Sequence, residues 1–216
     1  LETQTHSEKV DAVQLLMSLK NQGLPYSYKW EDYYANLKQH FEEIEKGRSG
    51  FGFFDKDETL SLRLHIILLR YMFGENGLEE LLETLSLISN GEEYEIISSL
   101  RALIDFPSLE TNKISGNSVQ PILLQYISSF CFNESHNVRY CTVQALYSLI
   151  ESQYTNFVIE RLSKMMDDDA YKVRWAVLYQ ASLIKKQNEQ IYNFIIQKAK
   201  IDNHHLVRRM VEKDNN

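Results

Sequence analysis

Apolar residues recur along most of this chain at alternating steps of four and three, a spacing that places them on one face of a helix. Trp30, Tyr34, Leu37, Phe41 and Ile44 form one such stripe. Similar stripes predict helices over residues 5–20, 27–46, 57–73, 78–89, 92–105, 119–132, 136–152, 155–166, 170–187, 189–200 and 203–213. Because the chain has only 8 Gly and 3 Pro, few residues interrupt these helices. We therefore predict an all-α fold with short polar loops.

A short motif recurs along the predicted helices: a branched apolar residue stands directly before an arginine. The arginines are Arg63, Arg101, Arg139, Arg174 and Arg208, separated by 38, 38, 35 and 34 residues. Six residues upstream of them stand Asp57, Glu95, Asn133, Asp168 and Asp202. A period of this length is the signature of stacked helical pairs. Since Pro107 falls inside one copy, we expect the repeat around Arg101 to be shortened or bent.

The last three copies carry the most regular pattern. They read Val138-Arg139 with Ala145-Leu146, Val173-Arg174 with Ala176 and Ala181, and Val207-Arg208 after Asp202. This pattern resembles HEAT-type helical repeats best over residues 119–213 and less closely over residues 57–105. The resemblance implies a right-handed α-solenoid of about five HEAT-like helical hairpins. Residues 57–216 would form the repeat array and residues 1–56 an N-terminal helical cap, in one continuous domain.

The recurrent acid and arginine have a structural role in HEAT-like folds, where they bond along the stack as a ladder. The resemblance implies this role for Asp168, Arg174, Asp202, Arg208 and Arg139, with Asn133 as a weaker, neutral member. The alternative is that the arginines grip a ligand such as a phosphate. An acid repeating in register with each arginine favours internal pairing, which specifies register more than it stabilises.

A second column of side chains lies one residue beyond the arginines. Its candidate partner-binding members are Tyr140, Gln144, Tyr147, Tyr171, Trp175, Tyr179 and Arg209. Positions four apart share a helix face, and the resemblance implies that second helices line a concave surface. Tyr, Trp and Arg are enriched in the hot spots of protein interfaces. The column therefore predicts a protein-binding face, although these rings could instead fill gaps between repeats.

Charge distribution bears on the kind of partner. The chain has a net charge of −7, and residues 57–120 alone carry 11 acids and 4 bases. Without a dense basic stripe, binding to nucleic acid is disfavoured. The acidic balance suits a basic protein partner, so an immunity-type protein that neutralises a basic toxin domain is an alternative. No apolar run is long enough to span a bilayer, no signal peptide is visible, and we expect a cytoplasmic monomer.

The residues that carry chemistry form no recognisable site. No two histidines lie four residues apart, and Cys131 and Cys141 offer neither a disulfide framework nor metal spacing. We therefore expect a non-enzymatic protein with no metal and no cofactor. The remaining alternative is a HEAT-like DNA-binding protein or a relative of the alkylpurine DNA glycosylases. Such a protein would use Trp175, Tyr179, Arg174, Arg208 and Asp169.

Overall fold

The computed structural model describes residues 77–105, 119–150 and 152–212, with further helical positions at 35, 39, 60, 63–68 and 71. The elements are α4 (Leu78–Ser89), α5 (Glu93–Asp105), α6 (Gln120–Ser129), η1 (Phe130–Phe132), α7 (His136–Tyr147), α8 (Thr155–Lys164), η2 (Met165–Asp167), α9 (Tyr171–Tyr179), α10 (Ala181–Gln187), α11 (Glu189–Lys200) and α12 (His205–Glu212). Every element of the described ranges is a helix, which confirms the all-α prediction there. The proposed cap over residues 1–56 lies outside them, apart from two helical positions.

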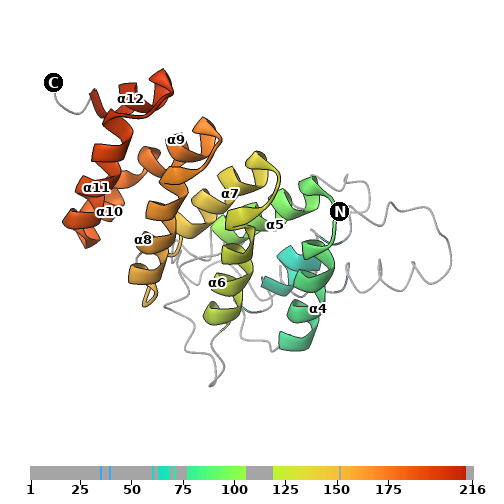
Figure 1. The fold of residues 1–216 in the computed structure, drawn as a ribbon. Helices are drawn as coiled ribbons and strands as arrows, with labels where there is room; N and C mark the ends of the chain where they lie inside the picture. Colours follow the sequence, from blue (N-terminus) through green and yellow to red (C-terminus); the bar gives the residue numbers. More distant parts are fainter. Residues whose placement is uncertain are drawn as a thin grey trace.

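Consecutive helices pack as pairs that lie side by side (Figure 1). α4 packs with α5, α6 with α7 and α11 with α12, while α8 connects to α9 through η2 and α10 packs against α11. The second helices α5, α7, α9 and α12 contact one another in that order along the molecule. Residues 34 to 43 positions apart in sequence are therefore spatial neighbours, and we call the side formed by α7, α9 and α12 the second-helix face.

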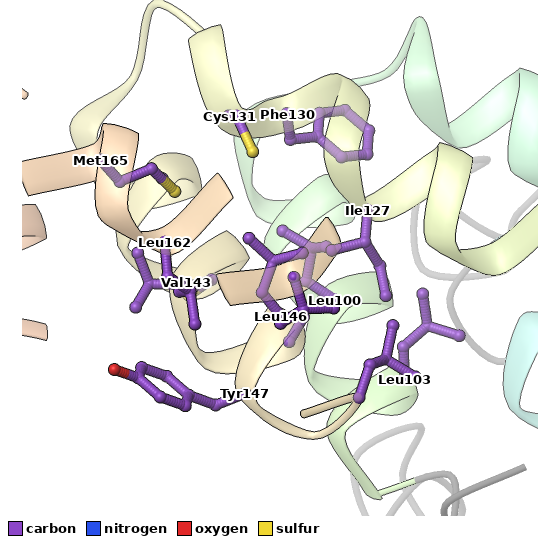
Figure 2. Packing of buried hydrophobic residues seen from close by; sticks show 14 of the residues in the cluster. Leu100, Leu103, Ile127, Phe130, Cys131, Val143, Leu146, Tyr147, Leu162 and Met165 are labelled. Atoms are coloured by element: carbon purple, nitrogen blue, oxygen red, sulfur yellow. The ribbon is translucent and has the colours of Figure 1, made fainter. Parts of the chain in front are cut away.

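One hydrophobic cluster runs through these pairs from Leu64 to Val211. Figure 2 shows its central part, to which α5, α6, η1, α7, α8 and η2 contribute Leu100, Leu103, Ile127, Phe130, Cys131, Val143, Leu146, Tyr147, Leu162 and Met165. Burying a Leu or Met side chain stabilises a fold by about 1.5–3 kcal/mol. No pair could shield its own apolar faces, so the stacked pairs depend on their neighbours.

Two predicted helices are shorter than their periodicity suggested. The helix predicted over 136–152 ends at Tyr147, and the one predicted over 170–187 breaks at Gln180 into α9 and α10. The Tyr147 hydroxyl donates a hydrogen bond to the Val177 carbonyl. In an unbroken helix that carbonyl would accept from the amide of Ala181. A contact between two repeats therefore replaces a helical hydrogen bond next to the break.

The two upstream copies of the arginine motif differ from the last three, Arg101 in helix position and Arg63 in its ion-pair partner. Arg139, Arg174 and Arg208 are each the fourth residue of their helix, whereas Arg101 is the ninth residue of α5. Arg63 pairs with the first helix of the next pair, at 3.0 Å from Glu83 of α4. The extension of the motif to Arg101 is therefore wrong, because Arg101 does not share the helix register of the last three arginines.

Within the described ranges, no helix combines the length and apolar character needed to cross a membrane.

Candidate functional site

The turn between α6 and α7 is tied to the next turn by Arg139. Its Nε and Nη2 donate to the two carboxylate oxygens of Asp168 at 2.7 and 2.9 Å. Nη2 also contacts the carboxylate of Asp169. Nη1 points the other way and donates to the carbonyls of Asn133 and Glu134 at 2.8 and 3.0 Å. One guanidinium thus holds its own turn through the backbone and the next turn through a carboxylate.

Arg174 repeats this arrangement one pair further along. Its Nε and Nη2 donate to the Asp202 carboxylate at 2.6 and 2.8 Å, and Nη2 also donates to the Asn203 side chain at 2.8 Å. Nη1 donates to the carbonyls of Asp168 and Asp169 at 2.6 and 3.0 Å. Bidentate pairing of arginine with a carboxylate fixes distance and angle together. These two rungs therefore set the spacing between three successive turns.

Arg208 forms half of a third rung. Its Nη1 donates to the Asp202 carbonyl at 2.5 Å, the position that Arg139 and Arg174 use on their own turns. Among the described residues, no carboxylate lies opposite Arg208 in the way that Asp202 lies opposite Arg174. The sequence motif therefore corresponds to two complete rungs and one that is bonded only to its own turn.

The acid of each rung has a second task within its turn. The side-chain oxygens of Asn133, Asp168 and Asp202 accept from the amide two residues further on, at 2.9, 2.8 and 2.8 Å. An amide performs this turn role as well as a carboxylate does. The fourth residue of α5 is Ile96, where the later second helices have arginine, so no cation at that position requires a charged partner. Asn133 therefore accepts the hydrogen bond within its turn but forms no ion pair.

Burial makes the ionic pairs sensitive to the loss of either partner. The side chains of Arg174 and Asp202 are 8% and 6% exposed. Hydrogen bonding from Arg174 lowers the pKa of Asp202, against the opposing effect of burial. The same bond raises the pKa of Arg174. Both groups remain charged across the neutral pH range. Because they hydrogen-bond to each other, they have no hydrogen-bonding capacity left for a ligand.

A groove of about 400 Å³ lies on the second-helix face, beside this ladder. Its lining comes from three successive second helices and consists of Asn137, Tyr140, Tyr171, Lys172, Trp175 and Leu206. We call it the second-helix groove. Its three rings are half-buried and pack with one side against the hydrophobic cluster. Packing on one side thus holds the rings in place, while each keeps part of its surface exposed.

Neighbouring rings extend the groove at both ends. The Tyr171 ring stacks on His204, with centroids 3.6 Å apart and planes 6° apart. The Trp175 ring stacks against Tyr179 at 5.2 Å, and Tyr179 is 65% exposed. Trp and Tyr are among the residues most enriched in the hot spots of protein-binding surfaces.

The predicted column is only partly brought together. Tyr140, Tyr171 and Trp175 line the groove, with Tyr179 next to Trp175. The Gln144 side chain donates to the Tyr140 hydroxyl at a long 3.5 Å and thus lies beside the groove. Arg209 is exposed on α12 but is not among the residues that line the groove.

Tyr147 does not belong to this surface, and its prediction as a binding residue is wrong. Its side chain is 4% exposed, and its hydroxyl donates to the Val177 carbonyl. Burial raises its pKa well above the ordinary value for tyrosine. Tyr147 is the final residue of α7, where α9 packs against that helix, so its ring fills the space between two repeats.

Three lining residues were missed by the sequence reasoning: Asn137, Lys172 and Leu206. Each stands two positions before the ladder arginine of its helix. This register could have identified them, because equivalent positions in stacked repeats line one face. Because their side chains differ in chemistry, the residue types alone do not mark them as members of one surface.

The metal-ligating and thiol side chains of the described residues form no recognisable site. They contain no group of three or more His, Cys, Asp or Glu side chains placed to hold a metal ion. Burial raises the pKa of Cys131 to about 11, and it also raises the pKa of Cys141. Both thiols are buried, and a thiol with a raised pKa is a poor nucleophile at neutral pH. The second-helix groove is therefore the best candidate for a functional site.

Comparison with protein-family models, with curated proteins and with solved structures found no match to this chain.

Proposed function

We propose that this chain is a HEAT-like right-handed α-solenoid that binds another protein in the second-helix groove, which would lie on the concave side. The observation that carries the proposal is the groove itself, in which three half-buried aromatic rings from α7 and α9 are presented to the outside. Held rings lose little conformational freedom on binding, so their burial contributes nearly its full value.

The contrast with the ladder supports a binding role for the groove. The most conspicuous charges on the turns, including Arg139 and Arg174, already have partners within the chain. The groove residues make few polar contacts of their own, apart from the hydrogen bond of Asn137 to Glu93 at 2.9 Å and the long bond from Gln144 to Tyr140. Polar groups with few partners and half-buried aromatic rings thus meet in the second-helix groove.

A protein segment fits the groove better than the DNA of a glycosylase. Lys172 is the one cation that lines it, whereas tight binding to a DNA backbone requires several cations that are not paired internally. Arg174, which the glycosylase alternative would use, is engaged by Asp202 and Asn203. We therefore favour a protein-binding function over a DNA-directed enzymatic one.

Affinity capture from a lysate of the source cell tests the proposal with four baits. The baits are the wild-type chain, Trp175→Ala, Tyr179→Ala and Phe194→Ala. Phe194 is a matched control, since it is a half-exposed aromatic residue on α11, a first helix. We expect a protein that wild type and Phe194→Ala retain and that the two groove variants lose. Equal retention by all four baits, with all of them folded, would exclude the groove as the binding site.

A further inference from the structure

The helices of the second-helix face differ in charge from the chain as a whole. Neither α7, α9 nor α10 contains an Asp or Glu, and α12 contains only its last residue, Glu212. By contrast, α4 and α5 carry Glu79, Glu80, Glu83, Glu93 and Glu95. The net charge of −7 therefore describes the acidic first part of the chain and not the face that carries the groove.

The acids that border the groove are engaged within the chain. Asp168 and Asp202 accept from ladder arginines, and Asp169 contacts Arg139. Glu93 accepts from the neutral Asn137 side chain, and this hydrogen bond lowers its pKa, so Glu93 keeps its negative charge beside the groove. An arginine already shared with a carboxylate contributes little field, and so does that carboxylate.

Two exposed cations lie along the same face. Lys172 lines the groove and is exposed, and Arg209 is exposed on the adjoining helix. Neither forms an ion pair with a residue in the described part of the chain. A ligand entering here meets aromatic rings flanked by positive charge, and complementary charge both steers encounter and selects the partner.

We propose that the occupant of the groove is an acidic segment of a partner protein. A large apolar side chain of that segment sits on the rings of Tyr140 and Trp175, and its carboxylates face Lys172 and Arg209. This inference rests on the proposed function, and it reverses the basic partner expected from the net charge of the chain. The sign of the partner is set by the local face because charges farther away than about 10 Å are screened.

Peptide selection tests the charge of the occupant without knowledge of the partner. Random twelve-residue peptides displayed on phage are selected on the immobilised full chain, with Trp175→Ala as the counter-selection bait. We expect the Trp175-dependent peptides to carry net negative charge and at least one large apolar residue. The most enriched peptide is then synthesised, and its affinity is measured by fluorescence polarisation.

A charge reversal and its control accompany that titration. Lys172→Glu should weaken binding by about tenfold or more, because it opposes the carboxylates of the peptide. Lys200→Glu, which reverses an exposed lysine at the end of α11, should leave the affinity unchanged. Equal weakening by both variants would show a non-specific effect of net charge and would overturn the assignment.

The possible outcomes separate this inference from the proposed function. Absence of any Trp175-dependent peptide would contradict both. Trp175-dependent peptides that are neutral or basic would support a binding groove and overturn its acidic occupant. A fluorescent twelve-residue oligothymidylate serves as a further probe, since aromatic rings beside cations also stack on single-stranded bases. Trp175-dependent binding of this oligonucleotide, without acidic peptides, would replace the protein segment with single-stranded nucleic acid.

Discussion

The turns that carry the arginine ladder and the second-helix face use their side chains for different purposes, and the contrast is sharpest at Arg174 and Trp175. Arg174 is nearly inaccessible and hydrogen-bonds to Asp202, Asn203 and two carbonyls. The next residue, Trp175, lies about 100° further around the helix axis and lines an open groove. A charge that recurs in register with an opposite charge is thus a structural feature, while an aromatic residue beside it remains available for binding.

Loss of the Arg174 side chain should have the largest effect on stability. Arg174→Ala leaves the buried Asp202 carboxylate without its partner, and removal of one member of a buried ion pair costs roughly 3–5 kcal/mol. Urea unfolding of the purified variant measures this loss. Arg209→Ala is the control, because Arg209 is exposed and its removal should change the unfolding free energy by less than about 0.5 kcal/mol. Similar losses in the two variants would erase the distinction between ladder and face.

Acid should weaken the same rung. The pKa of Asp202 is lowered in the folded chain from an ordinary value of 3.8, so the unfolded state binds a proton more readily. The stabilisation is therefore complete above about pH 4 and is lost as the pH falls through the lower, folded pKa. Urea unfolding at pH values from neutral to acid should show this loss. Asp202→Asn, which cannot titrate, should have a flatter acid limb, and an unchanged slope would contradict the pairing.

The incomplete rung should matter less than the complete one. Arg208→Ala removes a charged donor from the Asp202 carbonyl, and a hydrogen bond of this kind contributes roughly 1.5–3 kcal/mol. It strands no carboxylate in the described structure, in contrast to Arg174→Ala. The two unfolding free energies, measured side by side, should therefore differ clearly. Equal losses would show that Arg208 has an ionic partner equivalent to Asp202.

Tyr179→Ala should have the smallest effect on stability. Because 65% of this side chain is exposed, its loss should change the unfolding free energy by less than about 0.5 kcal/mol. Binding of the selected peptide should nevertheless weaken, since the ring adjoins Trp175. Unfolding and polarisation measurements on one preparation give both values. A large loss of stability with unchanged affinity would identify Tyr179 as a packing residue.

Most of the described helices could be predicted from sequence periodicity, and the predictions that failed have specific physical causes. The helices and the pairing positions of the last three repeats are visible in sequence, because each is fixed by local spacing. The resemblance at Arg101 misled because a two-residue motif does not define helix register. The break at Gln180 lies next to a hydrogen bond between Tyr147 and Val177, a contact between repeats that local periodicity cannot contain.

The candidate site was harder to predict than the fold. Tyr140 and Tyr147 lie seven residues apart, nearly two helical turns, and so share one face of α7. One lines the groove and the other is buried, because α9 covers only part of that face. Lys172 and Leu206 line the groove because neighbouring helices complete it around them. Which residues of one helix face remain accessible depends on how the next repeat is placed.

Trp175 itself can report whether the groove is the binding site. The chain has two tryptophans, Trp30 and Trp175, so Trp30→Phe leaves Trp175 as the sole indole fluorophore. The acidic peptide from the selection is titrated into this variant while quenching of the tryptophan by acrylamide is measured. Our account predicts that Trp175 becomes shielded, in a saturable manner and at the concentrations at which polarisation reports binding. Binding that leaves the quenching of Trp175 unchanged would place the site elsewhere and contradict the account.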